Sequence, residues 1–280
     1  MFEFENVRII AAKELRDSLR NRWFLIFTVA FAGLALALSA IGQSSGTQLR
    51  FSGYGRTAAS LINLVLLFVP LISLTLGATN LAGDRENGTL AYLLAQPVNH
   101  TEVILGKYLG MAGSLFSTIT LGFGLAGVAL ALQGSSGDVV GYVATIVLAY
   151  LLALAMLSLG FFMAAFVKKT AGALGGSLFM WLLLVFIGDL GIMGTAVVTQ
   201  MPIEAVFFIA MLNPLHLFKV SSILTIQASL EVLGPVGVYA TEQFGTALLP
   251  LAAIGLLLWI VIPLIGALLL FTRQEKFVWS

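Results

Sequence analysis

The sequence predicts an all-α integral membrane protein with six transmembrane helices. Of its 280 residues, 59% are apolar and only 10% are charged, whereas a soluble domain is about 25% charged. Apolar runs close to the ~20 residues that cross ~30 Å of hydrocarbon as a helix recur along the whole chain. A helix also satisfies its own backbone hydrogen bonds, as lipid requires. No stretch remains for a separate water-soluble domain.

The apolar runs divide the chain into a lead-in of 22 residues and one membrane domain over 23–280. Gly/Ser-rich turns and the Lys168-Lys169 pair separate the runs. We expect the spans at 23–41, 58–82, 108–132, 139–167, 170–195 and 247–271.

The lead-in, residues 1–22, has the pattern of an amphipathic helix. Val7, Ile10, Leu15 and Leu19 recur at helical spacing, and charged residues occupy the other sides. We expect this helix to lie in the membrane interface. A simple topogenic anchor fits the same pattern. A cleaved signal peptide fits poorly, because the segment carries both signs of charge.

The distribution of Lys and Arg predicts that both termini are cytoplasmic, because positive flanks are retained in the cytoplasm. This predicts a multi-pass protein of the inner (plasma) membrane, with residues 196–246 forming short extracytoplasmic helices. With six spans, one side holds Arg8, Lys13, Arg16, Arg20, Arg22, Arg85, Lys107, Lys168, Lys169, Arg273 and Lys276, and the other holds Arg50, Arg56 and Lys219.

The loop at 83–107 is the longest polar stretch in the middle of the chain. Asp84 or Asn87 can cap a short helix over 88–95. Pro97 then ends that helix, because proline lacks the backbone N–H that a helix interior needs. We therefore expect one short helix on the cytoplasmic face.

A second helix is expected to start just after this short one. Asn99 and Glu102 have the spacing of a capping box, with Asn in place of Ser or Thr. That helix continues into the third span, so the short helix is joined stiffly to a membrane helix. Such an element could transmit a movement of a bound partner to the membrane helix. A well-capped loop without this role fits the same sequence.

The loop sequence DRENGTLAYLLAQPVNHTEVILGK resembles the cytoplasmic loop of ABC-2 type transporter permeases. AKEL at 12–15, RNRW at 20–23 and the NP pair at 213–214 are similar to other parts of the same family. His100 departs from the family pattern, which usually has Arg there. Within the family, the chain most resembles the subfamily that serves nitrous oxide reductase maturation.

The resemblance implies a type V exporter-like permease fold and a homodimer bound by two copies of a cytoplasmic ABC ATPase, which would hold the ATP and magnesium. Resemblance to the subfamily named above further implies a periplasmic accessory protein as partner and the delivery of copper or sulfur species as the function. A drug or lipid exporter is the alternative within the family. The loop residues that we expect to dock the ATPase are Asp84, Arg85, Glu86, Gly88, Thr89, Leu90, Leu93 and Leu94.

The chain lacks the motif that an ATPase needs. A phosphate-binding loop requires a glycine-rich run followed by Lys and then Ser or Thr, whereas Lys107 is followed by Tyr108. We expect no catalytic residue, no metal site and no cofactor bound by this chain, and the net charge of +1 gives no indication of nucleic acid. Asp189 is expected near the outer interface. A passive channel, an ion-coupled carrier and a membrane scaffold remain alternatives.

The second span carries an unusual number of polar residues around a proline. Polar side chains avoid lipid, and a proline is a point at which a helix can flex. Contact between helices explains the set equally well. The candidates for a translocation path are Asn63, Pro70, Ser73, Thr75, Thr79 and Asn80.

Glycines spaced along the spans predict close helix packing. Gly106 and Gly110 begin the third span, and the fifth span carries further small residues. The pattern alone leaves open whether these contacts form within one chain or between two.

Overall fold

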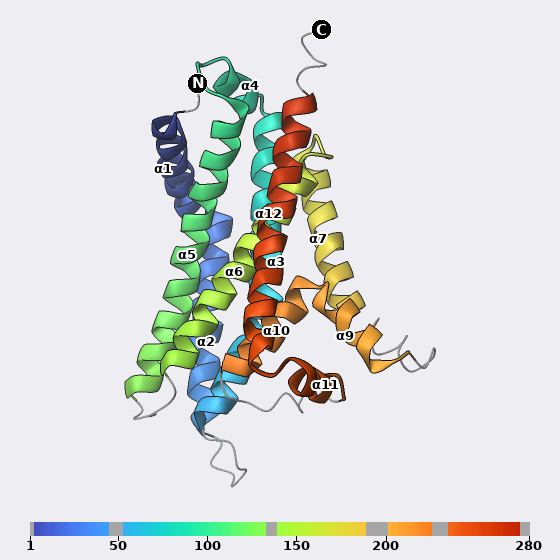
Figure 1. The fold of residues 1–280 in the computed structure, drawn as a ribbon. Coiled ribbons are helices and arrows are strands. Elements are labelled where there is room, and N and C mark those ends of the chain that lie inside the picture. The colour runs from blue at the N-terminus through green and yellow to red at the C-terminus, as the bar shows by residue number, and fades with distance from the viewer. Residues whose placement is uncertain (1–2, 45–52, 133–138, 189–200, 226–234, 275–280) are drawn as a thin grey trace.

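The computed structural model describes residues 3–44, 53–132, 139–188, 201–225 and 235–274, and almost all of them are helical. The long helices run side by side as a bundle (Figure 1). In chain order the elements are α1 (Phe4–Arg20), α2 (Arg22–Ser44), α3 (Gly53–Glu86), α4 (Thr89–Leu94), α5 (His100–Leu132), α6 (Val139–Ala164), α7 (Thr170–Phe186), α9 (Ile203–Met211), α10 (Pro214–Thr225), α11 (Pro235–Phe244), the short turn η3 (Gly245–Ala247) and α12 (Leu248–Gln274).

The described helices confirm an all-α membrane fold. Among them, α2, α3, α5, α6 and α12 are long and apolar enough to cross a membrane, and the pair α9–α10 makes a sixth candidate if it counts as one broken span. Helix α7 is also apolar but has 17 residues. Residues 189–195 of the predicted fifth span, including Asp189, lie outside the described residues. The structure thus allows five or six spans.

Helix α1 packs along the first part of α5 (Figure 1). A methyl group on Gly106 would lie 2.7 Å from Cβ of Ile10, and one on Gly110 would lie 2.6 Å from the carbonyl oxygen of Ala11. The predicted close approach at these two glycines is therefore confirmed, and it occurs within one chain. Only glycine allows the two backbones to come this near.

The amphipathic pattern of α1 is confirmed in part. Val7 and Ile10 are buried as predicted, whereas Leu19 is exposed and Glu14 is buried. The buried face lies against α5, and the position of this helix in the membrane interface stays a prediction. Glu14 can occupy this face because Lys107 pairs with it.

Helices α3 and α6 cross inside the bundle with their backbones almost in contact. A methyl group on Gly160 would lie 2.5 Å from the carbonyl oxygen of Leu74, and one on Gly77 would lie 2.8 Å from that of Leu157. Small residues at helix crossings in membranes permit this packing. Any larger side chain here must push the two helices apart.

Helices α9 and α10 form a pair bent by 102°, whose apex points into the bundle (Figure 1). Asn213 satisfies two backbone groups there: its Oδ1 accepts the N–H of Leu215 at 2.9 Å, and its Nδ2 donates to the carbonyl of Leu184 at 2.7 Å. Short helices were predicted here, but α10 inserts further than a surface helix would, since Phe218 and Ser221 are fully buried.

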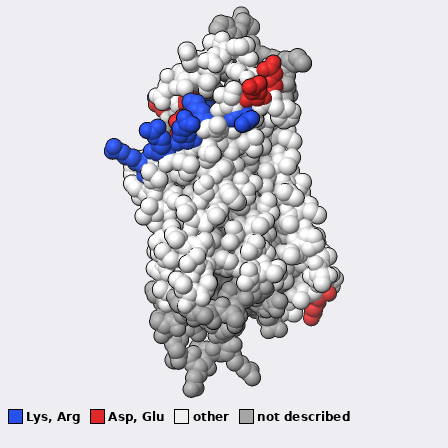
Figure 2. Space-filling model, turned by 90° about the vertical axis from the view of Figure 1, so that its left-hand side faces the viewer, with Lys and Arg blue, Asp and Glu red and all other residues white. Residues whose placement is uncertain are grey.

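Most charged side chains on the face drawn in Figure 2 gather near one end of the molecule, and a smaller acidic patch lies near the other end. Between them is a broad belt without Lys, Arg, Asp or Glu. The start of α1, helix α4 and the end of α12 lie at this charged end (Figure 1). The belt is suited to contact the hydrocarbon core of the membrane, because a charged group in lipid is costly.

Candidate functional site

Helix α4 stands at the charged end of the bundle, between α3 and α5 (Figure 1). Gly88 precedes it with φ 74°, a left-handed conformation that favours glycine. The observed helix Thr89–Leu94 confirms the predicted one over 88–95. The predicted caps, Asp84 and Asn87, are wrong: Gly88 is the N-cap, and no side chain caps this helix.

The half of the predicted capping box that Glu102 forms is confirmed at the start of α5. Glu102 Oε2 accepts the backbone N–H of Asn99 at 3.2 Å. The same carboxylate also accepts the backbone N–H of Glu3 at 2.7 Å and Nδ2 of Asn6 at 3.0 Å, and it is fully buried. One carboxylate therefore ties the start of α1 to the start of α5, which local sequence could not indicate.

The leucines of α4 face the protein and its aromatic residue faces outward. Leu90 is buried in the main core, against which Leu93 and Leu94 are partly packed. Tyr92 is 70% exposed. The side chain of Leu90 is occupied within this chain, and docking of Leu93 and Leu94 in a groove of the partner stays a prediction. Tyr92, which the sequence-based selection omitted, is the large side chain that α4 presents.

Arg85 and Glu86, two of the charged residues expected to dock a partner, have partners within the chain. Arg85 Nη1 donates to the carbonyl oxygens of Ala164 and Val167 at 3.3 and 3.4 Å, and its guanidinium lies 4.6 Å from the ring centre of Phe271. Glu86 accepts the backbone N–H and Oγ1 of Thr170 at 2.8 and 2.6 Å, which supplies a cap for α7. These residues join the end of α3 to α6, α7 and α12.

Lys107 is the centre of a buried ionic cluster that the sequence did not reveal. Its Nζ lies 2.6 Å from Glu14 Oε1, donates to Asn80 Oδ1 at 3.0 Å and pairs with Asp84. Asn80 Nδ2 in turn donates to Glu14 Oε2 at 3.2 Å. Lys107 is 0% and Glu14 3% exposed. The cluster joins α1, α3 and α5 at the base of α4.

The cluster carries two carboxylates for one buried lysine, and Lys13 adds a second positive charge at its edge. Lys13 Nζ lies 3.4 Å from Glu14 Oε1 and 3.2 Å from Asp17 Oδ2. Partial burial lowers the pKa of Lys13, but the two carboxylates outweigh it and leave the pKa above its ordinary value. Charges buried this deeply are stable in a protein only when they are paired. Removal of one charged group of the cluster should therefore destabilise the groups paired with it.

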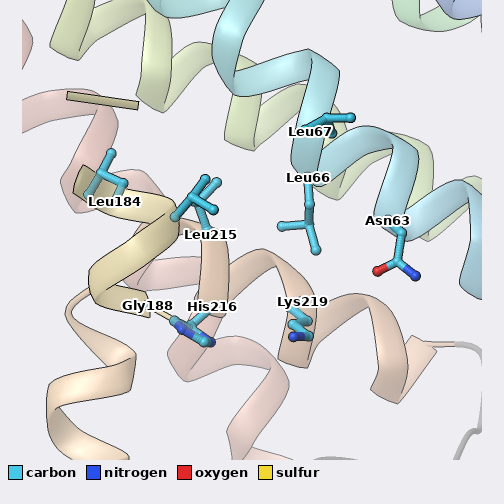
Figure 3. Close-up of a pocket in the computed structure, with 9 residues that line it drawn as sticks. Asn63, Leu66, Leu67, Leu184, Gly188, Leu215, His216 and Lys219 are labelled. Carbon is cyan, nitrogen blue, oxygen red and sulfur yellow. The ribbon is translucent and has the colours of Figure 1, made fainter. Parts of the chain in front are cut away.

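The six residues of α3 predicted for a translocation path have different surroundings in the structure. Ser73 is buried, while Thr75 and Thr79 donate to carbonyls of their own helix. Asn80 belongs to the ionic cluster, and Asn63 lines a pocket (Figure 3). Pro70 lies inside the helix. A translocation path along the whole set stays a prediction.

Within the described part of the chain, no group of three or more His, Cys, Asp or Glu residues could hold a metal ion. His100 begins α5 at the charged end, whereas His216 lies in α10 in the other half of the bundle (Figure 1). The two histidines thus belong to separate sites.

These features define a polytopic membrane protein whose long helices are linked to one short helix at its charged end. The chain belongs to the ABC-2 family of transporter proteins, because residues 8–276 match that family. It is a permease of this family, and membership implies an ABC ATPase as partner.

Two relatives named "probable ABC transporter permease protein NosY" are similar to this chain. The protein of Stutzerimonas stutzeri is 30% identical over 271 residues, covering 95% of this chain and 97% of the relative. The protein of Pseudomonas aeruginosa is 31% identical over 222 residues, covering 75% and 78%. The resemblance to the NosY-like subfamily is confirmed by both.

Proposed function

We propose that this chain is the membrane-spanning subunit of an ATP-binding cassette transporter, moved by a separate ATPase that docks on α4 from the cytoplasm. A homodimer of the chain works with two copies of the ATPase, which bind the ATP and magnesium. The excess of Lys and Arg at the α4 end supports its placement in the cytoplasm, together with both termini, in the inner (plasma) membrane.

The observation that carries this proposal is the set of bonds at the base of α4. Asp84, Arg85 and Glu86 are the last three residues of α3, two residues before α4 begins, and each contacts a different part of the bundle. Through them α4 is tied to α1, α5, α6, α7 and α12. A force on α4 therefore reaches most of the bundle through short, rigid contacts, as an externally powered permease requires.

The name of the two relatives supports a narrower role. We infer that the transporter delivers copper or sulfur species for nitrous oxide reductase maturation, together with a periplasmic accessory protein. Deletion of the gene in the native host should then leave nitrous oxide reductase inactive. A fully active reductase in the deletion strain would remove this role while leaving the permease assignment intact.

Replacing the exposed Tyr92 tests docking on α4. Exposed Tyr side chains are frequent centres of binding energy in interfaces. We expect Tyr92→Glu to lower the amount of ATPase that co-purifies in mild detergent by at least roughly tenfold, because a carboxylate replaces an apolar anchor. The matched control, Tyr92→Phe, keeps the ring and should retain most of the ATPase. Wild-type recovery with Tyr92→Glu would rule out this surface.

A further inference from the structure

The outward face of α1 and the residue that begins α2 carry a group of basic side chains. Arg8, Arg16 and Arg20 on α1 are exposed, as is Arg22 at the start of α2. Within the part of the chain that the structure describes, none of these four guanidinium groups makes an ion pair or a hydrogen bond. All four can therefore contact a ligand outside the chain.

Helical geometry places the arginines of α1 opposite the side that packs on α5. At 3.6 residues per turn, Arg8, Arg16 and Arg20 share about one third of the circumference of α1. The buried residues Ile10 and Glu14 lie on the other side of the helix. Packing against α5 thus leaves the basic face open.

Large apolar side chains are interspersed with the arginines on this face. Ile9 is 61%, Leu19 38% and Trp23 73% exposed. Ile9 and Leu19 fall in the same part of the circumference of α1 as the arginines, and Trp23 follows near the start of α2. Exposed apolar residues next to basic ones are typical of helices at a membrane surface, and Trp favours the level of the lipid headgroups.

The basic face lies at the border of the belt that has no charged side chains. Figure 2 shows a band of Lys and Arg side chains beside that belt, on the side of the molecule where Figure 1 draws α1. The first candidate membrane span, Arg22–Ala40, begins two residues after the end of α1. This face is therefore placed at the level of the headgroups.

The charges of this face favour an anionic partner. Two exposed carboxylates also belong to α1: Asp17 pairs with Lys13 at 3.2 Å, and Glu5 lies in the first turn. They are outnumbered by the four arginines. A guanidinium group binds phosphate oxygens through two parallel hydrogen bonds, and anionic lipids attract basic segments that adjoin a membrane span.

We propose that the outward face of α1 binds the headgroups of anionic phospholipids in the leaflet on the α4 side. The four arginines contact the lipid phosphates, and Ile9, Leu19 and Trp23 lie among the adjoining parts of the acyl chains. A lipid is favoured over a protein partner because exposed apolar side chains and the start of a span occupy the same surface. The inference goes beyond the docking of an ATPase and does not depend on it.

The test compares the binding of an anionic and a zwitterionic lipid to the full-length chain. The chain is purified in mild detergent and titrated with phosphatidylglycerol or phosphatidylcholine, and native mass spectrometry counts the lipids retained per chain. Wild type should retain phosphatidylglycerol at concentrations at least roughly tenfold lower than phosphatidylcholine, because of the attraction between the arginines and the anionic headgroup. Equal retention of the two lipids would overturn the proposal.

A matched pair of double variants locates the site. Arg16→Gln with Arg20→Gln should weaken phosphatidylglycerol binding by at least roughly tenfold, because two headgroup contacts are lost. Lys168→Gln with Lys169→Gln removes the same number of positive charges from exposed positions in the α6–α7 turn, and this control should bind the lipid as wild type does.

A second double variant, Arg8→Gln with Arg22→Gln, repeats the test at the two ends of the face if the first variant does not fold. Unchanged phosphatidylglycerol binding in both arginine variants, or an equal loss in the lysine control, would overturn the proposal. Loss of the co-purifying ATPase with unchanged lipid binding would assign this face to the ATPase and would overturn the proposal as well.

Discussion

Lys107→Met should be the most destabilising single change in the cluster at the base of α4. It removes the positive charge that Glu14 and Asp84 share, and Glu14 is only 3% exposed. Removing one partner of a buried ion pair typically costs about 3–5 kcal/mol, because the other partner stays buried without compensation. We expect a large fall in the unfolding midpoint of the purified chain, measured by tryptophan fluorescence, together with loss of protease protection of α1.

A triple variant distinguishes the loss of charge pairing from the loss of packing around Lys107. The triple variant Lys107→Met, Glu14→Gln, Asp84→Asn removes the charges together, and neutral replacement of a whole buried ionic group is often tolerated. It should recover much of the lost stability. Lys13→Met is the matched control, because the Lys13 side chain is 52% exposed and exposed pairs contribute about 0–1 kcal/mol. A Lys107→Met variant as stable as Lys13→Met would contradict the account of the cluster.

Gly160→Ala should have the second large effect, since it adds a methyl group where α6 meets α3. That methyl group would lie 2.5 Å from the carbonyl oxygen of Leu74 and 3.0 Å from the backbone nitrogen of Ala78. Neither atom can move without its helix. Overpacking of this kind costs about 1–3 kcal/mol, so the unfolding midpoint should fall.

Gly175→Ala on α7 gives the control for this substitution. Nothing lies within 4 Å of a methyl group at Gly175, which is exposed. Alanine in place of glycine inside a helix is stabilising by roughly 0.5–1 kcal/mol, so this variant should be as stable as the wild type or slightly more stable. Shifts of the same sign and size at both positions would show that α3 and α6 are not in backbone contact.

The sequence predicts local structure in the loop at 83–107 well, because the signals there are local. Gly88 and Pro97 delimit α4, and Asn99 with Glu102 starts α5. Each of these effects acts within four residues along the chain, so no knowledge of distant neighbours is needed. The all-helical membrane class follows in the same way from apolar runs.

Partners distant in sequence account for what the sequence did not reveal. In the sequence, Lys107 resembles the end of an incomplete phosphate-binding motif. Its ion-pair partners Glu14 and Asp84 are 93 and 23 residues away along the chain, so local sequence does not indicate them. The charges before α4 look like a free docking surface, but they bond to other helices. A charged residue on the glycine-lined face of α5 is the signal that could have indicated Lys107, since Gly106 and Gly110 mark that face as a packing surface.

The packing direction of amphipathic segments is equally hidden. The apolar face of α1 fits lipid or protein alike, and only the structure shows that α5 covers it. In α10, the polar residues His216 and Lys219 do not by themselves show that the helix folds back into the bundle and lines a pocket.

The central claim is that this chain does not power transport itself and is moved by an ATPase attached at α4. The most direct measurement is to purify the chain from its native host in mild detergent and to identify the chains bound to it. We predict a second chain that contains G-x-x-x-x-G-K-[S/T], present in equal number with the permease and hydrolysing ATP in the complex. In intact cells, a cysteine placed by Tyr92→Cys in this naturally cysteine-free chain should resist membrane-impermeant thiol reagents. A preparation without any nucleotidase, or a Tyr92→Cys variant labelled from outside the cell, would contradict the account.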